Sequence, residues 1–249
     1  MFRENYPLAW VYHSNTSLVF SKQMRRHEWH GRPFKEYADL PLIPLPPFKR
    51  PRLSLVTTIE MRRSCRHYAL GAMSLEDVST LLHYSYGILR RSVTGTSEVL
   101  LRPVPSGGGL YPLELYFLSQ NVKGLGRGLY HYSAISHGLE KLFTIKNSSF
   151  EKECFVDPTG IQRAACIIFI TSVVGRMCWK YGDRGYRMLL MEAGHVAQNI
   201  NLVATSLKLG SLNINGFYDS AVSKLLHLDT EEEVPLYCVA VGKRQGVLA

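Results

Sequence analysis

The chain has 249 residues, of which 46% are hydrophobic and 20% charged, so its composition is that of a globular protein and excludes a disordered one. Its formal net charge of +9 favours anionic partners such as phosphate-bearing cofactors or acidic peptides, but the basic residues form no single run and no nucleic-acid motif occurs. No apolar stretch approaches the roughly 18 residues of a membrane span and no secretory signal begins the chain, so we expect a cytoplasmic protein with no nucleic acid or membrane partner.

The N-terminal segment, residues 1–55, is predicted to be an irregular arm that packs on the main domain or on a partner. The five prolines between residues 41 and 51 favour an extended connector without helix. Trp10, Tyr12 and Trp29 indicate that the arm is anchored. The main domain is predicted to be residues 56–249.

The first helix of the main domain is predicted to begin at Ser74, which together with Asp77 forms a variant of the capping box. Gly87 is a suitable C-cap. Strands are predicted at residues 113–119, 128–133, 166–173 and 235–242, with 166–173 in the centre of its sheet. Because strands and helices do not alternate strictly, we expect an α+β fold.

The longest helix is predicted at about residues 186–208, with apolar residues on much of its circumference. Such a helix is buried in a core or at a dimer interface. Gly194 in its middle costs about 1 kcal/mol of helix propensity, which suggests that another group approaches the backbone there. His195 is interpreted as a core histidine, and Gly210 is predicted to end the helix.

Two short segments have the composition of a cofactor site. Arg62, Arg63, Ser64 and Arg66 offer forked donors that match phosphate oxygens, although a solvated basic turn would have the same composition. In residues 105–112, PSGGGLYP, three glycines let the backbone approach a flat ligand, or form a tight turn before the next strand. The glycines of residues 124–128 precede a strand, so they indicate a hairpin turn and no dinucleotide site.

Lys180 and Tyr181 precede the long helix, together with Arg184 and Arg187. A lysine beside an apolar helix is partly desolvated, which lowers its pKa and makes it a usable base, and the adjacent phenol relays a proton. The structural alternative is a surface lysine and a packed tyrosine. The five cysteines form no C-x-x-C pair, so we predict no metal site and no disulfide framework.

Taken together, these segments resemble the flavin-dependent nitroreductase superfamily, and within it the SagB-type azoline dehydrogenases of thiazole/oxazole-modified peptide pathways. The resemblance covers about residues 60–244 and little of residues 1–55. It is carried by RRSCRHY, RPVPSGGGLYPLELYFL, GLYHYS, KYGDRGYRMLLMEAGHVAQN, LKLGS and VGKR. It implies a nitroreductase-like FMN-binding fold, a mixed or antiparallel sheet flanked by helices with a long buried central helix, in an obligate homodimer with two FMN sites.

The resemblance also implies roles for individual residues. Lys180 and Tyr181 match the family's catalytic pair. The residues expected to bind FMN are Arg62, Arg63, Ser64 and Arg66 with Lys243 and Arg244 at the phosphate, Pro105, Ser106, Gly107 and Gly108 from the second subunit, and the loop Gly210, Ser211 and Leu212 beside the flavin ring.

The implied reaction is FMN-dependent oxidation of a thiazoline or oxazoline in a peptide or peptide-like substrate to the thiazole or oxazole. Lys180 or Tyr181 takes a proton, and the sequence does not separate their roles. Because no ATP-binding motif occurs, ring formation would need a partner cyclodehydratase. The alternatives are an NAD(P)H-dependent nitro or quinone reductase, a SagB-type oxidase of a carrier-bound or other small substrate, and a non-catalytic scaffold.

Overall fold

The computed structural model describes residues 1–18, 28–94, 97–145 and 150–245. Its main element is a seven-stranded sheet of order β1-β6-β5-β4-β7-β9-β8, in which every described pair of neighbours is antiparallel. The four predicted strands are confirmed, and β7 has neighbours on both sides. The strands are β1 (Leu42–Pro44), β4 (Leu113–Ser119), β5 (Gly128–Ser133), β6 (Gly138–Thr144), β7 (Cys166–Val173), β8 (Leu209–Ile214) and β9 (Glu233–Lys243).

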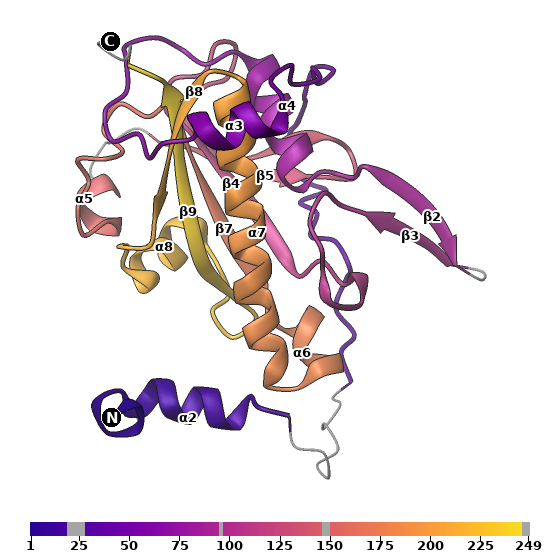
Figure 1. Ribbon diagram of the computed structural model, residues 1–249. Helices are drawn as coiled ribbons and strands as arrows, with labels where there is room; N and C mark the ends of the chain where they lie inside the picture. The colour runs from indigo at the N-terminus through magenta and orange to yellow at the C-terminus, as the bar shows by residue number, and fades with distance from the viewer. Residues whose placement is uncertain (19–27, 95–96, 146–149, 246–249) are drawn as a thin grey trace.

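Helices cover both faces of this sheet, as expected for the α+β class. α4 (Leu75–Tyr86) and α7 (Arg184–Ser206) pack on one face, and α5 (Phe150–Cys154) and α8 (Asp219–Leu226) on the other (Figure 1). The alternation of side chains along β7 explains this division, because Ile168 and Ile170 contribute to the first core whereas Ile167 and Phe169 contribute to the second.

The start of α4 follows the prediction. The Ser74 side chain accepts a hydrogen bond from the backbone N–H of Asp77 at 3.1 Å, and Gly87 is the C-cap. Between α4 and β4 the chain forms a two-stranded hairpin, β2 (Arg90–Thr94) and β3 (Ser97–Leu101), which projects from the body of the molecule (Figure 1). The sequence did not indicate this hairpin.

α7 is shorter at its C-terminal end than predicted, and only one of its faces is buried. That face carries Ala193, Val196 and Ile200. His195 lies on the exposed face, so its interpretation as a core histidine is wrong. The expectation for Gly194 is also wrong within this chain, because a Cβ there would meet no described atom within 4 Å.

The N-terminal arm is more ordered than predicted. It begins with α1 (Phe2–Asn5) and α2 (Pro7–Asn15), so the expectation of an irregular segment fails there. Arg184 donates to the carbonyl of Thr16 at 2.9 Å, and Arg187 donates to the carbonyl of His13 at 3.1 Å. The two guanidiniums therefore bind the C-terminal end of α2, where the helix dipole favours positive charge.

The arm then crosses the second face of the sheet, where that face is polar. Lys35 Nζ lies 2.6 Å from Glu233 and 2.8 Å from the hydroxyl of Tyr116. Further on, β1 pairs with β6 at the edge of the sheet. Residues 32–37 thus lie over the part of this face that carries Glu114, Tyr116 and Glu233. In the described part of the chain, no helix is long and apolar enough to cross a membrane.

Candidate active site

The predicted phosphate-binding segment follows α3 (Leu55–Met61), whose N-cap Ser54 accepts from the backbone N–H of Thr57 at 3.1 Å. After Arg62 the chain turns to lie against β8. The backbone N–H of Cys65 donates to the carbonyl of Ser211 at 2.8 Å. This contact joins positions that are almost 150 residues apart in the sequence, and it brings the predicted residues 62–66 and 210–212 together.

Residues 210–212 form part of strand β8, so their prediction as a loop is wrong. The helix ends at Ser206, and Lys208 takes the left-handed conformation, with φ of 60°, that was expected of Gly210. Gly210 instead lets the segment around Cys65 lie close to β8, because a Cβ on Gly210 would lie 2.5 Å from Cys65 Sγ.

The last strand completes this cluster. The backbone N–H of Ala69 donates to the carbonyl of Lys243 at 2.9 Å, and Tyr68 forms a β-bridge with Arg244. None of the basic side chains in this cluster has an ion-pair partner within the described residues; they are Arg62, Arg63, Arg66, Lys243 and Arg244. Guanidinium and ammonium groups without an ion-pair partner, together with the hydroxyl of Ser64, suit a dianionic phosphate. We call this group the basic cluster: Arg62, Arg63, Ser64, Arg66, Lys243 and Arg244.

The glycine loop, residues 105–112, contains a short 3-10 turn at Gly107–Gly109. Gly108 and Gly109 have φ of 63° and 67°, a conformation that favours glycine. A Cβ on Gly108 would lie 2.8 Å from Lys180 Nζ and 2.8 Å from the hydroxyl of Tyr181. The missing side chain therefore lets the amine and the phenol of the predicted catalytic pair reach the loop backbone.

Lys180 and Tyr181, the predicted catalytic pair, end the short helix α6 (Gly175–Tyr181), which stops at Gly182 with φ of 55° before α7 begins. Both side chains are half-buried, and Lys180 Nζ lies 5.5 Å from the centroid of the Tyr181 ring. An amine and a phenol at this separation, beside the glycine loop, suit proton transfer to or from a ligand that covers the loop.

The basic cluster and the glycine loop lie at opposite ends of α7. α3 and β8 adjoin its C-terminal end, whereas α6 adjoins its N-terminal end (Figure 1). At 1.5 Å per residue, the 23 residues of α7 span about 34 Å. Within one chain, the helix therefore separates the basic cluster from the glycine loop, and we call these two groups the half-sites.

A group that the sequence did not single out lies beneath the glycine loop. Glu192, on the buried face of α7, accepts a hydrogen bond from the Tyr86 hydroxyl at 2.9 Å. Burial raises the pKa of Glu192 to about 7, although Ser106, Tyr86 and Arg102 oppose this shift. The signal in the sequence was a single acidic residue within the apolar stripe of a helix.

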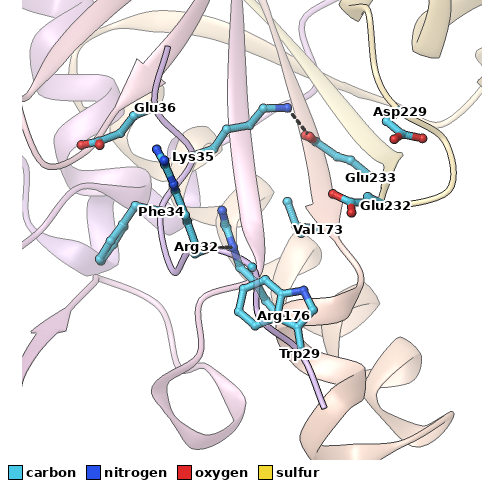
Figure 2. Close-up of a pocket in the computed structure, with 11 residues that line it drawn as sticks. Trp29, Arg32, Phe34, Lys35, Glu36, Val173, Arg176, Asp229, Glu232 and Glu233 are labelled. Atoms are coloured by element: carbon cyan, nitrogen blue, oxygen red, sulfur yellow. Dashed lines mark hydrogen bonds and ion pairs between the residues drawn. The ribbon is translucent and has the colours of Figure 1, made fainter. Parts of the chain in front are cut away.

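A groove in the structure lies elsewhere, under the N-terminal arm. Figure 2 shows Lys35 pointing toward Glu233 at one side, with the ring of Trp29 and the side chain of Arg176 at the other. None of the predicted site residues lines it. The described residues contain no group of three or more His, Cys, Asp or Glu side chains that could hold a metal ion.

Comparison with known families agrees with this geometry. Residues 59–243 match the nitroreductase family model. The chain belongs to the nitroreductase family. A Methanocaldococcus jannaschii protein assigned as a nitroreductase is 33% identical over 192 residues, which cover 77% of this chain and 92% of that protein.

The expected resemblance to the SagB-type branch is supported by a relative that processes a peptide. The microcin B17-processing protein of Escherichia coli is 35% identical over 140 residues, which cover 54% of this chain but only 52% of that protein. The matched region is thus about half the length of this relative.

Solved structures share the fold. An Anabaena variabilis nitroreductase is 29% identical with a TM-score of 0.74, over 94% of this chain and 45% of that one. A chain of the Escherichia coli microcin synthetase complex, solved with truncated pro-microcin B17 bound, gives a TM-score of 0.61 at 24% identity, over 94% of this chain and 86% of that one. The predicted nitroreductase-like fold is confirmed.

Proposed function

We propose that this chain is an FMN-dependent azoline dehydrogenase, which oxidises thiazolines or oxazolines in a peptide or peptide-like substrate to the aromatic azoles. The observation that carries the proposal is the closeness of Lys180 and Tyr181 to Gly108, where a Cβ would lie 2.8 Å from the amine and 2.8 Å from the hydroxyl. An amine and a phenol thus lie beside the loop on which the family would hold a flat cofactor. The identity to a microcin-processing protein supports a peptide azoline as substrate.

The residues of both half-sites suit FMN. The basic cluster would hold the phosphate, and β8, from Gly210 to Leu212, would lie along the flavin. The glycine loop, from Pro105 to Gly108, offers a surface with few side chains to the flat ring system. FMN, when bound, supplies the acceptor for the hydride that leaves the azoline.

A homodimer would bring the two half-sites together. Because α7 separates them within one chain, each FMN would take its phosphate site from one protomer and its glycine loop from the other. The exposed face of α7 supports this arrangement, since Leu190 and Met191 are 41% and 53% exposed in the single chain. Leu55 and Val56 of α3, which are 68% and 65% exposed, would extend the apolar contact.

The chain's own residues would carry out the proton transfer. Lys180 Nζ or the hydroxyl of Tyr181 would take the proton from the azoline Cα, and the other group would orient the ring. Both groups are half-buried, and partial exclusion of water strengthens their interactions with the substrate. Ring formation would fall to a partner cyclodehydratase, as the assembly of the related microcin synthetase complex suggests.

The test begins with the absorbance spectrum of the purified protein, which should show bound flavin. Incubation with an azoline peptide should then give a mass loss of two hydrogens per ring. We expect Lys180→Ala and Tyr181→Phe to keep FMN and to slow azole formation by roughly 10²- to 10⁴-fold, the usual contribution of a general base. Parent-level oxidation by either variant would remove that residue from the mechanism. Rapid bleaching of the flavin by NAD(P)H, without azoline oxidation, would favour a reductase instead.

A further inference from the structure

The glycine loop is supported from below by a buried hydrogen-bond network. Arg102 donates to the backbone carbonyl of Tyr86 at 2.8 Å, and its guanidinium lies 4.2 Å from the centroid of the Tyr86 ring. The Tyr86 hydroxyl donates to Glu192 and accepts from the backbone N–H of Leu113 at 3.1 Å. The network thus connects α4, α7 and the first residue of β4.

The same network fixes both ends of the loop. Ser106 Oγ accepts from the backbone N–H of Tyr111 at 2.9 Å, which closes the loop around its three glycines. The Tyr111 hydroxyl accepts from the backbone N–H of Arg102 at 3.1 Å. Gly108, where a Cβ would lie 2.8 Å from both Lys180 Nζ and the Tyr181 hydroxyl, lies within the loop that these bonds close.

Glu192 is the acidic member of this network and is almost completely buried, with 2% of its surface exposed. Only Oε1 has a hydrogen-bond partner within the described residues, whereas Oε2 is buried without one. The titratable and charged groups that face it are Tyr86 from α4 and Arg102 from the segment after β3. Such a carboxyl is costly to bury and adds less to packing than an apolar side chain of the same size would.

We propose that Glu192 is a positioning residue, which holds Tyr86, and through it Leu113 at the end of the loop, so that the glycine loop presents Gly108 to Lys180 and Tyr181. This inference rests on the proposed function, because it assigns a role only if Lys180 and Tyr181 act on the ligand at this loop. Glu192 itself contacts neither side chain in any described interaction, and it acts through the loop.

The test compares Glu192→Met and Glu192→Gln in the full-length protein. Methionine keeps the length of the side chain but removes its hydrogen bonds, whereas glutamine keeps an acceptor for Tyr86. Val203→Ala, on the same helix but far along it from the loop, is the control for general destabilisation. Hydrogen exchange of the amides in residues 104–112 reports the loop directly, without any need for activity.

We expect Glu192→Met to accelerate exchange in this segment by roughly tenfold and to lower kcat for azoline oxidation by a similar factor. Glu192→Gln should restore slow exchange and most of the activity, and its kcat should lack the dependence on pH near 7 that we expect of the parent. Val203→Ala should change neither the loop nor kcat.

Parent-like exchange and parent-like kcat in Glu192→Met would overturn the inference. So would equal loop exchange in Glu192→Met and Val203→Ala, because the effect would then be general destabilisation. If Glu192→Met loosens the loop but the parent protein oxidises no azoline, the proposed function fails while the support of the loop by Glu192 stands. The two failures are therefore distinguishable.

Discussion

Two buried polar networks in this protein differ in how completely their charges are paired. Under the N-terminal arm, Glu114 lies 2.5 Å from Arg176 and 3.1 Å from His131, which also contacts Glu140 at 2.7 Å. Under the glycine loop, Glu192 has a tyrosine hydroxyl on one oxygen and no partner on the other within the described residues.

The pKa values of the two carboxyls follow this difference. Burial alone would raise the pKa of Glu114, but the hydrogen bond and charge of His131, together with Arg176, lower it to about 2. Burial raises the pKa of Glu192 to about 7, because its neighbours offset burial only in part. Glu114, whose charge is paired, thus stays ionised at all ordinary pH values and stabilises the fold. Glu192, whose carboxyl is incompletely paired, changes its protonation state with pH at the proposed active site.

The largest effect should come from breaking the paired network. Glu114→Gln leaves Arg176 and His131 buried without the negative charge that pairs with both, and we expect it to lower the free energy of unfolding by about 3–5 kcal/mol. Urea denaturation measures this loss. The control is Glu28→Gln, which removes an ion pair with His30 whose side chains are 91% and 86% exposed, and which should change stability little. A small loss for Glu114→Gln would show that the arm is not held by these charges.

The pH dependence of stability should separate the two carboxyls. The folded pKa of Glu192 exceeds that of an unfolded glutamate, so the folded state binds more protons between about pH 4.5 and 7. Its contribution to stability is therefore full at low pH and is lost as the pH rises, by on the order of 3 kcal/mol. Glu114 has a lowered pKa, so its contribution is present above about pH 4.5 and is lost toward pH 2.

Denaturation curves of the parent and Glu192→Gln between pH 5 and 8 measure the first effect. The parent should lose stability across this interval more than the variant does. Identical slopes in the two proteins would mean that Glu192 is ionised with an ordinary pKa, and the contrast between the networks would disappear.

A smaller effect should distinguish the glycine loop from its immediate neighbour. Gly108→Ala and Gly109→Ala both place a side chain in the left-handed region, at a cost of about 1–2 kcal/mol. Only the Cβ at Gly108 would strike Lys180 and Tyr181, since that at Gly109 meets nothing within 4 Å. Azole formation should fall in Gly108→Ala and persist in Gly109→Ala, as mass spectrometry would record. Equal activities of the two variants would show that the closeness of Gly108 to Lys180 and Tyr181 does not matter for azole formation.

The smallest effect should come from the outer end of the arm. Arg187→Ala removes a donor to the last turn of α2, where exposed hydrogen bonds contribute roughly 1 kcal/mol or less. Hydrogen exchange in residues 7–16 should increase while global stability and FMN binding remain those of the parent. Loss of FMN would instead connect Arg187 to the cofactor site.

The sequence predicted those parts of the fold that local patterns determine. The Ser74 cap, the strand at 166–173 and the long helix each follow from residues close together in the chain. It could not predict that Glu114 would meet Arg176 and His131, or that Lys35 would meet Glu233, because these pairings depend on the order of strands in the sheet.

In the candidate site too, local patterns could be predicted from the sequence, whereas contacts between distant segments could not. Composition indicated the arginines at 62–66 and the glycines at 107–109. The place of Lys180 and Tyr181 before an apolar helix made them candidates, and resemblance to the family assigned them as the catalytic pair. Gly210 was expected in a loop, since a glycine after a helix often ends it, but Lys208 takes the left-handed position here. The support of the loop by Glu192 became visible only when α4 and α7 were placed side by side.

The most direct test of the central claim, that each active site draws on two chains, uses two inactive variants together. One chain carries Arg62→Ala and Arg66→Ala, and the other carries Lys180→Ala. In the heterodimer, purified through two different tags, one site is assembled from intact halves and the other from altered halves. We predict one bound FMN and about half of the parent's azoline oxidation per dimer, although each variant alone is inactive. A heterodimer that forms but oxidises no azoline would contradict the account.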